Sequence, residues 1–203
     1  MKKIFVLLTL FLMVSCAYND KRYIETQEDK LNAAIKMAEN SEIIETKLFL
    51  DFQFGMTEKE AQNHVSQLVR DGKFKLNSKG KYAHSFTTNR GRECEILAAP
   101  SYHDGKLYKI IYVIVSNTVV IHYDMSETFG ESERGRDFDE YQTKNVLDER
   151  IFTFVKDNLV STFRESGLFE ARMIYENAPV AKLVREEEER QKREDAQKSS
   201  AEF

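Results

Sequence analysis

The first 16 residues constrain this chain more than any other segment. Lys2 and Lys3 form a short basic start, and the apolar run from Ile4 to Val14 is broken only by Thr9. At a helical rise of about 1.5 Å per residue, such a run is too short to cross the roughly 30 Å hydrocarbon core of a bilayer. The pattern is that of a cleaved signal peptide and not of a transmembrane helix, so the folded protein begins downstream of it.

The residues that end this run carry a more specific signal. Residues 12–16 (LMVSC) resemble the lipobox of bacterial lipoproteins, in which a small residue precedes a cysteine, although Met13 stands where that family usually has Leu. The resemblance implies a signal peptide over residues 1–15, diacylglycerol on the sulfur of Cys16 and an acyl chain on its amine. Two or more acyl chains hold a protein stably in a membrane. The alternative is an ordinary secretory signal with an incidental cysteine.

A lipidated Cys16 predicts that the protein is anchored in the cell envelope. Ala17 follows the cysteine in place of Asp, which in Gram-negative lipoproteins resembles sorting to the outer membrane. Residues 16–27 are expected to form a lipid-anchored tether. With Cys16 acylated, Cys94 is the only other cysteine, so we expect no intramolecular disulfide.

Residues 28–180 are expected to form a single domain. Apolar residues at helical spacing predict a helix over residues 28–45. A capping box at Thr57 and Glu60 predicts a second helix, which Gly72 ends. Runs of branched and aromatic residues predict strands over Phe74–Leu76, Tyr82–Thr88, Cys94–Tyr102, Lys106–Val115 and Val119–Tyr123.

Three features refine this predicted sheet. The pair Asp104-Gly105 predicts a tight hairpin turn. Lys106–Val115 has the composition of a central strand, whereas Pro100 indicates an edge strand or a bulge.

The remaining segments complete the prediction. Alternating apolar residues from Leu48 to Phe54 predict a short strand or an extended arm, and the polar residues 124–145 predict a loop. Apolar residues at steps of four from Leu147 to Phe163 predict a helix, and Leu168–Tyr175 a strand. Residues 181–203 are expected to form a charged helical tail, which is either a solvated extension without a partner or a docking helix.

This order of elements predicts an α+β fold, with helices packed on one face of an antiparallel sheet and a charged C-terminal helix. The stretch Phe54-Gly55-Met56-Thr57, followed by Glu60 and an amphipathic helix, resembles the opening of small outer-membrane-assembly lipoproteins and of β-lactamase-inhibitor-protein-like domains. The resemblance is confined to this stretch. It implies an architecture and no functional residues.

The sequence contains no compact catalytic or metal-binding motif. There is no CxxC, and no metal-binding spacing joins the four histidines, His64, His84, His103 and His122. Cys94 with His84 as its base is a poor nucleophile, because the flanking Glu93 and Glu95 oppose formation of the thiolate. We therefore predict no catalytic residue, no metal and no cofactor.

Two glycine- and acid-containing patterns between residues 130 and 148 also fail as motifs. A calcium loop starting at Asp137 has Gln142 where the sharp turn requires Gly, and Asp148 where a bidentate Glu is needed. Gly130 and Gly135 have the spacing of a phosphate-binding loop, but Arg136-Asp137 follows them in place of Lys-Ser or Lys-Thr.

One charge asymmetry marks a candidate anion- or partner-binding patch. All charged residues between Gly72 and Arg92 are basic, namely Lys73, Lys75, Lys79, Lys81, Arg90 and Arg92. Such a patch suits anionic headgroups near the anchor or an acidic partner. Alternatively, the lysines protect a solvated sheet edge against pairing. The balance of 30 basic and 34 acidic residues excludes binding of nucleic acid through bulk basicity.

Together these features predict a lipid-anchored envelope protein that acts as a binding module and not as an enzyme. Its expected partners are the membrane, through the N-terminal lipid, and another envelope protein. Two alternatives remain open at this point. One is an envelope hydrolase with a dispersed active site, and the other is an inhibitor-like module that blocks an enzyme with the loop 124–145.

The anchor can be tested by the substitution Cys16→Ser. Without its thiol, the chain cannot accept diacylglycerol, so we expect the protein to move from the membrane to the soluble fraction and to lose incorporation of labelled fatty acid. Cys94→Ser, which leaves the N-terminus intact, is the control and should fractionate like the wild type. Unchanged membrane association of Cys16→Ser contradicts the lipid anchor.

Overall fold

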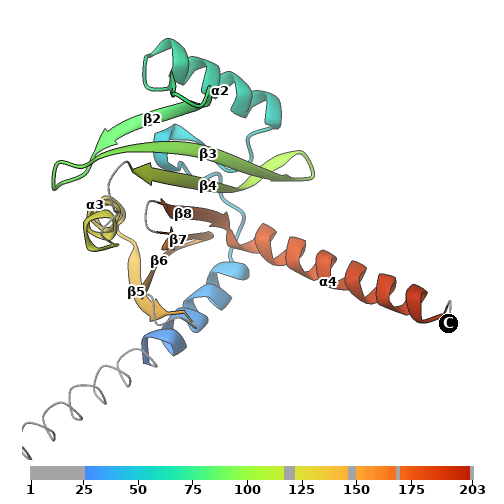
Figure 1. Ribbon diagram of the computed structural model, residues 1–203. Coiled ribbons are helices and arrows are strands. Elements are labelled where there is room, and N and C mark those ends of the chain that lie inside the picture. Colours follow the sequence, from blue (N-terminus) through green and yellow to red (C-terminus); the bar gives the residue numbers. More distant parts are fainter. Residues whose placement is uncertain (1–25, 117–121, 146–149, 168–169, 202–203) are drawn as a thin grey trace, which may run out of the picture.

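The computed structural model describes residues 26–116, 122–145, 150–167 and 170–201 (Figure 1). Within these ranges the strands form one antiparallel sheet, in the order β1-β2-β3-β4-β8-β7-β6-β5, which confirms the α+β class. The strands are β1 Lys75–Leu76, β2 Tyr82–Thr87, β3 Glu93–His103, β4 Lys106–Ser116, β5 Asp139–Lys144, β6 Arg150–Lys156, β7 Leu159–Gly167 and β8 Glu170–Asn177. The helical elements are residues 26–39, η1 Phe49–Asp51, α2 Glu58–Arg70, α3 His122–Arg134 and α4 Ala178–Ala201.

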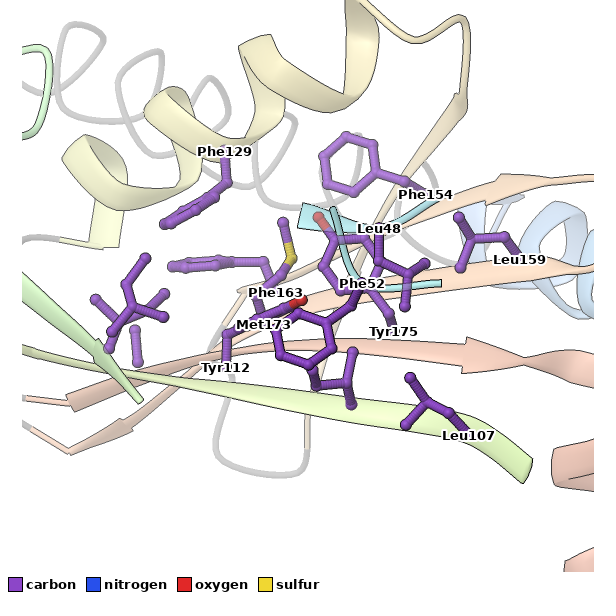
Figure 2. Close-up of a cluster of buried hydrophobic side chains, with 14 of the residues drawn as sticks. Leu48, Phe52, Leu107, Tyr112, Phe129, Phe154, Leu159, Phe163, Met173 and Tyr175 are labelled. Atoms are coloured by element: carbon purple, nitrogen blue, oxygen red, sulfur yellow. The ribbon is translucent and has the colours of Figure 1, made fainter. Parts of the chain in front are cut away.

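Strand β4 lies between β3 and β8, in the middle of the sheet, as its composition predicts. Its alternate side chains point to opposite faces, so that Ile110, Tyr112 and Ile114 are buried while Ile111 and Val113 are half-buried. The buried face is the inner face of a twisted sheet, and the main core lies against it. Figure 2 shows this core, in which strand residues meet side chains from α3 and from residues 48–54.

The prediction of a short strand or an extended arm over Leu48–Phe54 is wrong. The segment contains the short helix η1 and only one bridge, between Lys47 and Gln53. Its apolar alternation comes from burial against the inner face, since Phe52 and Phe54 are 0% and 1% exposed. The hydroxyl of Tyr112 donates a 2.6 Å hydrogen bond to the carbonyl oxygen of Phe49 and so fixes the segment to the sheet.

The capped helix is confirmed as α2. The Thr57 hydroxyl accepts a 3.2 Å hydrogen bond from the Glu60 backbone amide, and the Glu60 carboxylate accepts a 2.7 Å bond from the Thr57 amide. Gly72, with φ +70°, follows the helix in the left-handed conformation typical of a C-terminal cap. Ala61 and Leu68 bury one side of the helix against the core.

The β3–β4 hairpin is also confirmed. Asp104 and Gly105 have φ values of 49° and 72°, as a tight turn with two left-handed residues requires. Pairing between β2 and β3 ends where His84 faces Ile96, so Pro100 lies beyond it, next to the irregularity between Ser101 and Tyr102. Pro100 therefore lies in a part of β3 that β2 does not pair with, as the predicted edge position requires.

The predicted helix over Leu147–Phe163 is wrong. Residues 146–149 lie outside the described part of the chain, and the rest forms the hairpin of β6 and β7. Val155 pairs with Val160 across a turn at Asp157 and Asn158, in which Asp157 has φ 51°. A step of four residues fits the period of a strand as well as that of a helix, because four is a multiple of two.

The predicted loop over residues 124–145 is wrong as well, because it contains most of α3 and all of β5. The inhibitor-like alternative rested on that loop and loses its structural basis. Of the strand predicted over Val119–Tyr123, residues 119–121 lie outside the described ranges, and His122 and Tyr123 belong to α3.

The other helix and strand predictions hold with shifted limits. The first helix is described over residues 26–39 and ends before residue 45. Strand β8 confirms the described part of Leu168–Tyr175, and α4 confirms the helical tail but begins at Ala178.

Helices lie against both faces of the sheet. Helices α2 and α3 contribute to the main core on the inner face. The helix of residues 26–39 packs on the outer face, in a second cluster formed by Leu31, Ala38, Val155, Val160 and Ala178. Among the described residues, no helix combines the length and the apolar character needed to cross a membrane.

Candidate functional site

A concave, largely apolar surface lies beside the β3–β4 hairpin. Here residues 43–45, the hairpin and the start of α4 come together (Figure 1) and enclose a groove of about 390 Å³. We call it the hairpin groove, and its main apolar lining residues are Ile43, Ile44, Leu107, Tyr108, Val180 and Leu183. Pockets of this size and character are typical of ligand sites.

Large apolar side chains are unusually exposed in the hairpin groove. Ile43, Ile44 and Leu183 are 62%, 46% and 47% exposed, although each belongs to a residue type that favours burial. They come from segments about 140 positions apart in the sequence and meet at one place. An apolar surface gathered in this way favours the binding of an apolar partner.

A buried polar group lines the same groove. Asn177 is 2% exposed, and its Oδ1 has no hydrogen-bond partner in the part of the chain that the structure describes. A buried acceptor without a donor costs about 1–3 kcal/mol of stability, so such groups are rare in folded proteins. Because Oδ1 itself is closed off from the groove, this acceptor is a cost to the fold and not a contact point for a ligand.

Asn158, in the turn between β6 and β7, holds two walls of the groove in place. Its Nδ2 donates a 3.0 Å hydrogen bond to the carbonyl oxygen of Ile44, and its Oδ1 accepts a 3.2 Å bond from the Thr46 hydroxyl. Its own carbonyl oxygen accepts a 2.7 Å bond from the amide of Ala178, the first residue of α4. One fully buried residue therefore joins residues 44–46, through its side chain, to α4, through its backbone carbonyl.

Further contacts fix α4 and the hairpin. The Arg185 guanidinium lies 2.7 Å from the Glu39 carboxylate, and the Lys182 ammonium donates a 3.2 Å hydrogen bond to Asn40 Oδ1. The amide of Gly55 donates a 2.9 Å bond to the carbonyl oxygen of Leu107. The walls are thus held by contacts within the protein, and the groove exists before a ligand binds.

The predicted basic patch divides into two parts. Lys73, Lys75, Lys79 and Lys81 lie on β1 and beside its turn into β2, whereas Arg90 and Arg92 lie in the turn between β2 and β3. Six residues of β2 separate the two groups, which corresponds to about 20 Å.

Acidic residues from other elements approach both parts of this patch. Asp51 lies 4.0 Å from Lys73, and Glu127 lies 3.6 Å from Arg90. In Figure 1, the helix of residues 26–39 and the region of α2 and β2 lie at opposite ends of the molecule.

The other candidate residues do not converge on a reactive site. Cys16 lies outside the described residues. Cys94 is buried opposite Phe86, while the ring of His84 packs against Phe49 and its Nδ1 lies 2.9 Å from the carbonyl oxygen of Lys73. Across the described ranges, no group of three or more His, Cys, Asp or Glu side chains has the geometry of a metal site.

A buried carboxyl, Glu133, forms a second polar cluster that the sequence does not reveal, because it lies within the predicted loop. Glu133 is 1% exposed, accepts a 2.7 Å hydrogen bond from the Tyr175 hydroxyl and lies 3.5 Å from the Arg136 guanidinium. Arg136 in turn donates to the carbonyl oxygen of Lys47. These polar atoms are paired, so the cluster joins α3 to β8 and to the residues before η1, and its role is structural.

Burial raises the pKa of Glu133, and the hydrogen bond from Tyr175 and the charge of Arg136 only partly oppose this effect. The buried carboxyl is thus more easily protonated than an exposed one.

Sequence reasoning also misses the hairpin groove. Ile43 and Ile44 extend the pattern of the first predicted helix, and Leu183 lies among other apolar residues at the start of the charged tail. This short apolar stretch is a local signal, since apolar residues at the start of a charged helix indicate a contact.

Comparison of the chain with protein-family models, with curated proteins and with solved structures gives no match. The interpretation of the hairpin groove therefore rests on its own geometry.

Asn177→Leu tests whether the unpaired acceptor is a cost to the fold. Removing it should raise the free energy of unfolding by about 1–3 kcal/mol, measured by urea denaturation. Asn158→Leu is the matched control, because it removes a buried asparagine whose side chain is fully bonded, and it should lower stability by a similar amount. A loss of stability in both variants contradicts the unpaired state of Asn177.

Glu133→Gln tests the buried carboxyl. A pKa raised by folding means that the native state holds the proton more tightly, so the contribution of Glu133 to stability is largest below the unfolded pKa and falls as pH rises through the native pKa. Glutamine can still accept from Tyr175 but does not titrate. The stability of wild type relative to Glu133→Gln should therefore decrease as the pH rises from 4 toward 7, and a constant difference contradicts the raised pKa.

Proposed function

We propose that the protein is a lipid-anchored binding module of the cell envelope and that the hairpin groove is its binding site. The observation that carries this proposal is the convergence of three exposed apolar side chains, from segments far apart in the sequence, in one groove. The lipobox resemblance at Cys16 supports the anchor. A preformed groove on a tethered domain suits a protein that captures a partner at the membrane.

The residues of the groove support binding more than catalysis. The described lining contains no serine, threonine or cysteine that can act as a nucleophile. Its histidine, His103, lies 3.6 Å from Asp104 and 3.8 Å from Glu187, and it packs edge-on against Tyr108. In this position it links the hairpin to α4 at the rim of the groove.

Fluorescence of N-phenyl-1-naphthylamine tests the groove as a binding site. This neutral probe has an apolar body and one N–H donor, and its emission rises in apolar surroundings. We expect saturable binding in the micromolar range and a loss of about tenfold in affinity for Leu183→Glu, which places a charge in the groove. Because Leu183 is half-exposed, this substitution should leave the free energy of unfolding nearly unchanged.

The control is Leu76→Glu on β1, where the leucine is 62% exposed and lies outside the groove. It introduces the same charge and should change probe affinity by less than about twofold. Absence of saturable binding by the wild type, or equal weakening by the two variants, contradicts the groove as the binding site.

A further inference from the structure

Strand β3 is paired along its whole length on one side but only along its first part on the other. Strand β4 pairs with it from Cys94 to His103, whereas the pairing with β2 ends at His84 and Ile96 (Figure 1). Among the described residues, no strand continues along this second side from Leu97 to His103. An unpaired strand edge presents backbone donors and acceptors to which a further strand can bond.

The backbone of Tyr102 faces this unpaired side. Its partner on β4 is Leu107, whose amide donates a 2.7 Å hydrogen bond to Met56 and whose carbonyl accepts a 2.9 Å bond from Gly55. Tyr102 and Leu107 thus form a non-hydrogen-bonded pair, in which the amide and carbonyl of each residue point away from the partner strand. Directions repeat at every second residue, so the carbonyl of Pro100 faces the same side, although proline has no amide to offer.

An apolar groove lies beside the same stretch of β3. It has a volume of about 350 Å³ and is formed by α2, β3 and the start of β2. We call it the edge groove, and its lining includes Ala98, Pro100, Tyr102, Val65 and Tyr82. The three residues from β3 are alternate residues of one strand, so the side chains on the same face of an added strand would enter the edge groove.

The unpaired stretch is short and bounded at both ends. It spans Leu97–His103, which corresponds to about 20 Å and leaves room for about five extended residues. At one end β2 begins at Tyr82, and at the other the chain turns at Asp104 and Gly105. A single extended segment suits such a recess. In a second copy of this chain the same edge lies between its own β1–β2 hairpin and its own α2, which disfavours pairing of two copies.

Basic residues gather at the end of the edge groove where β2 begins. They are exposed lysines of β1 and of the turn into β2, namely Lys75, Lys79 and Lys81. In the part of the chain that the structure describes, their ammonium groups have no carboxylate within 4.0 Å. Lys81 directly precedes Tyr82, which lines the groove. Such a cluster favours negative charge on a ligand that ends there.

Acidic residues in the same region do not cancel this charge. They are Asp51, Asp71 and Glu95, and their carboxylates contact Lys73, Gln67 and Asn77. With Arg70 and Lys73 included, the five basic residues of this end outnumber the three acidic ones. At the opposite end, beside the start of α2, two acidic and two basic residues balance each other, namely Glu58, Glu60, Lys59 and Lys106.

We propose that an extended segment of a partner protein adds to the unpaired side of β3 as a further antiparallel strand. Its backbone bonds to the carbonyls of Pro100 and Tyr102 and to the amide of Tyr102, and its alternate apolar side chains lie in the edge groove. Because β2 also runs antiparallel to β3, the C-terminal end of the segment lies near the start of β2, where acidic residues meet Lys81.

In such complexes the main-chain bonds supply affinity and the side-chain pockets supply specificity. The edge groove and the hairpin groove share no lining residue, so this proposal does not rest on the function proposed above.

N-methylated peptides test the main-chain bonds. The ligand is fluorescein-Gly-Thr-Val-Thr-Val-Glu-Glu-amide, and its binding to the full-length protein is followed by fluorescence anisotropy. Residues that face each other in a hydrogen-bonded antiparallel pair have side chains on the same face, so the valines that enter the groove also bond to β3. We expect saturable binding at micromolar concentrations. N-methylation of both valines should weaken it by about tenfold or more, and that of both threonines by less than about threefold.

Two tryptophan substitutions on α2 locate the site. Gln62 and Asn63 are neighbours and both are exposed, but only Gln62 lines the edge groove. Gln62→Trp should fill the groove and weaken peptide binding by about tenfold, whereas Asn63→Trp should change it by less than about twofold. Neither variant should alter the binding of N-phenyl-1-naphthylamine to the hairpin groove.

Two charge reversals test the acidic end of the ligand. At low ionic strength the wild type should prefer the peptide ending in Glu-Glu to one ending in Lys-Lys by about fivefold. Lys81→Glu should reduce this preference to less than about twofold. Lys36→Glu, the same change at an exposed position of the helix of residues 26–39, should preserve it.

Three results contradict the proposal. Absence of saturable binding, or equal weakening by the two N-methylation patterns, overturns strand addition. Equal effects of Lys81→Glu and Lys36→Glu overturn the acidic end of the ligand. A dimer of the wild type that Gln62→Trp converts to a monomer assigns the edge to a second copy of this chain and overturns the partner segment.

Discussion

The arrangement of the molecule around its groove depends on the side-chain and backbone hydrogen bonds of one buried residue, Asn158. It sits in a tight turn, is 0% exposed, and bonds to Ile44, Thr46 and Ala178. These partners belong to the segment after the first helix and to the start of α4. Together with the Arg185–Glu39 ion pair and the Lys182–Asn40 hydrogen bond, this link positions residues 43–45 and the start of α4 relative to the sheet.

The two buried asparagines near the groove differ in whether their side-chain oxygen is hydrogen-bonded within the fold. Asn158 uses its side chain within the fold, whereas Asn177 leaves an acceptor unpaired and so lowers the stability of the free protein. Exposed Ile43, Ile44 and Leu183 add a similar cost, since apolar surface in water is unfavourable. Such exposed apolar surface commonly lies at functional sites, where a partner covers it. The proposed lipid anchor would bring this surface close to a membrane and to the proteins there.

Local sequence signals predict the parts of the fold that local chemistry determines. The capping box at Thr57 and the Asp104-Gly105 turn are of this kind, because the residues that define them are neighbours in the chain. The β6–β7 hairpin is missed because a step of four residues fits both helix and strand, and that error conceals the turn that holds Asn158. The groove itself joins residues 43–45 with α4, and no local pattern reports such a contact. Likewise, the unpaired state of Asn177 depends on what surrounds it in three dimensions.

The central claim, that segments far apart in the sequence form one binding site, is tested most directly by the affinity of N-phenyl-1-naphthylamine for Ile43→Glu and for Leu183→Glu. Each substitution places a charge in the hairpin groove from a different segment, so both should weaken binding by about tenfold. A loss of affinity in one variant alone, or in neither, contradicts the account.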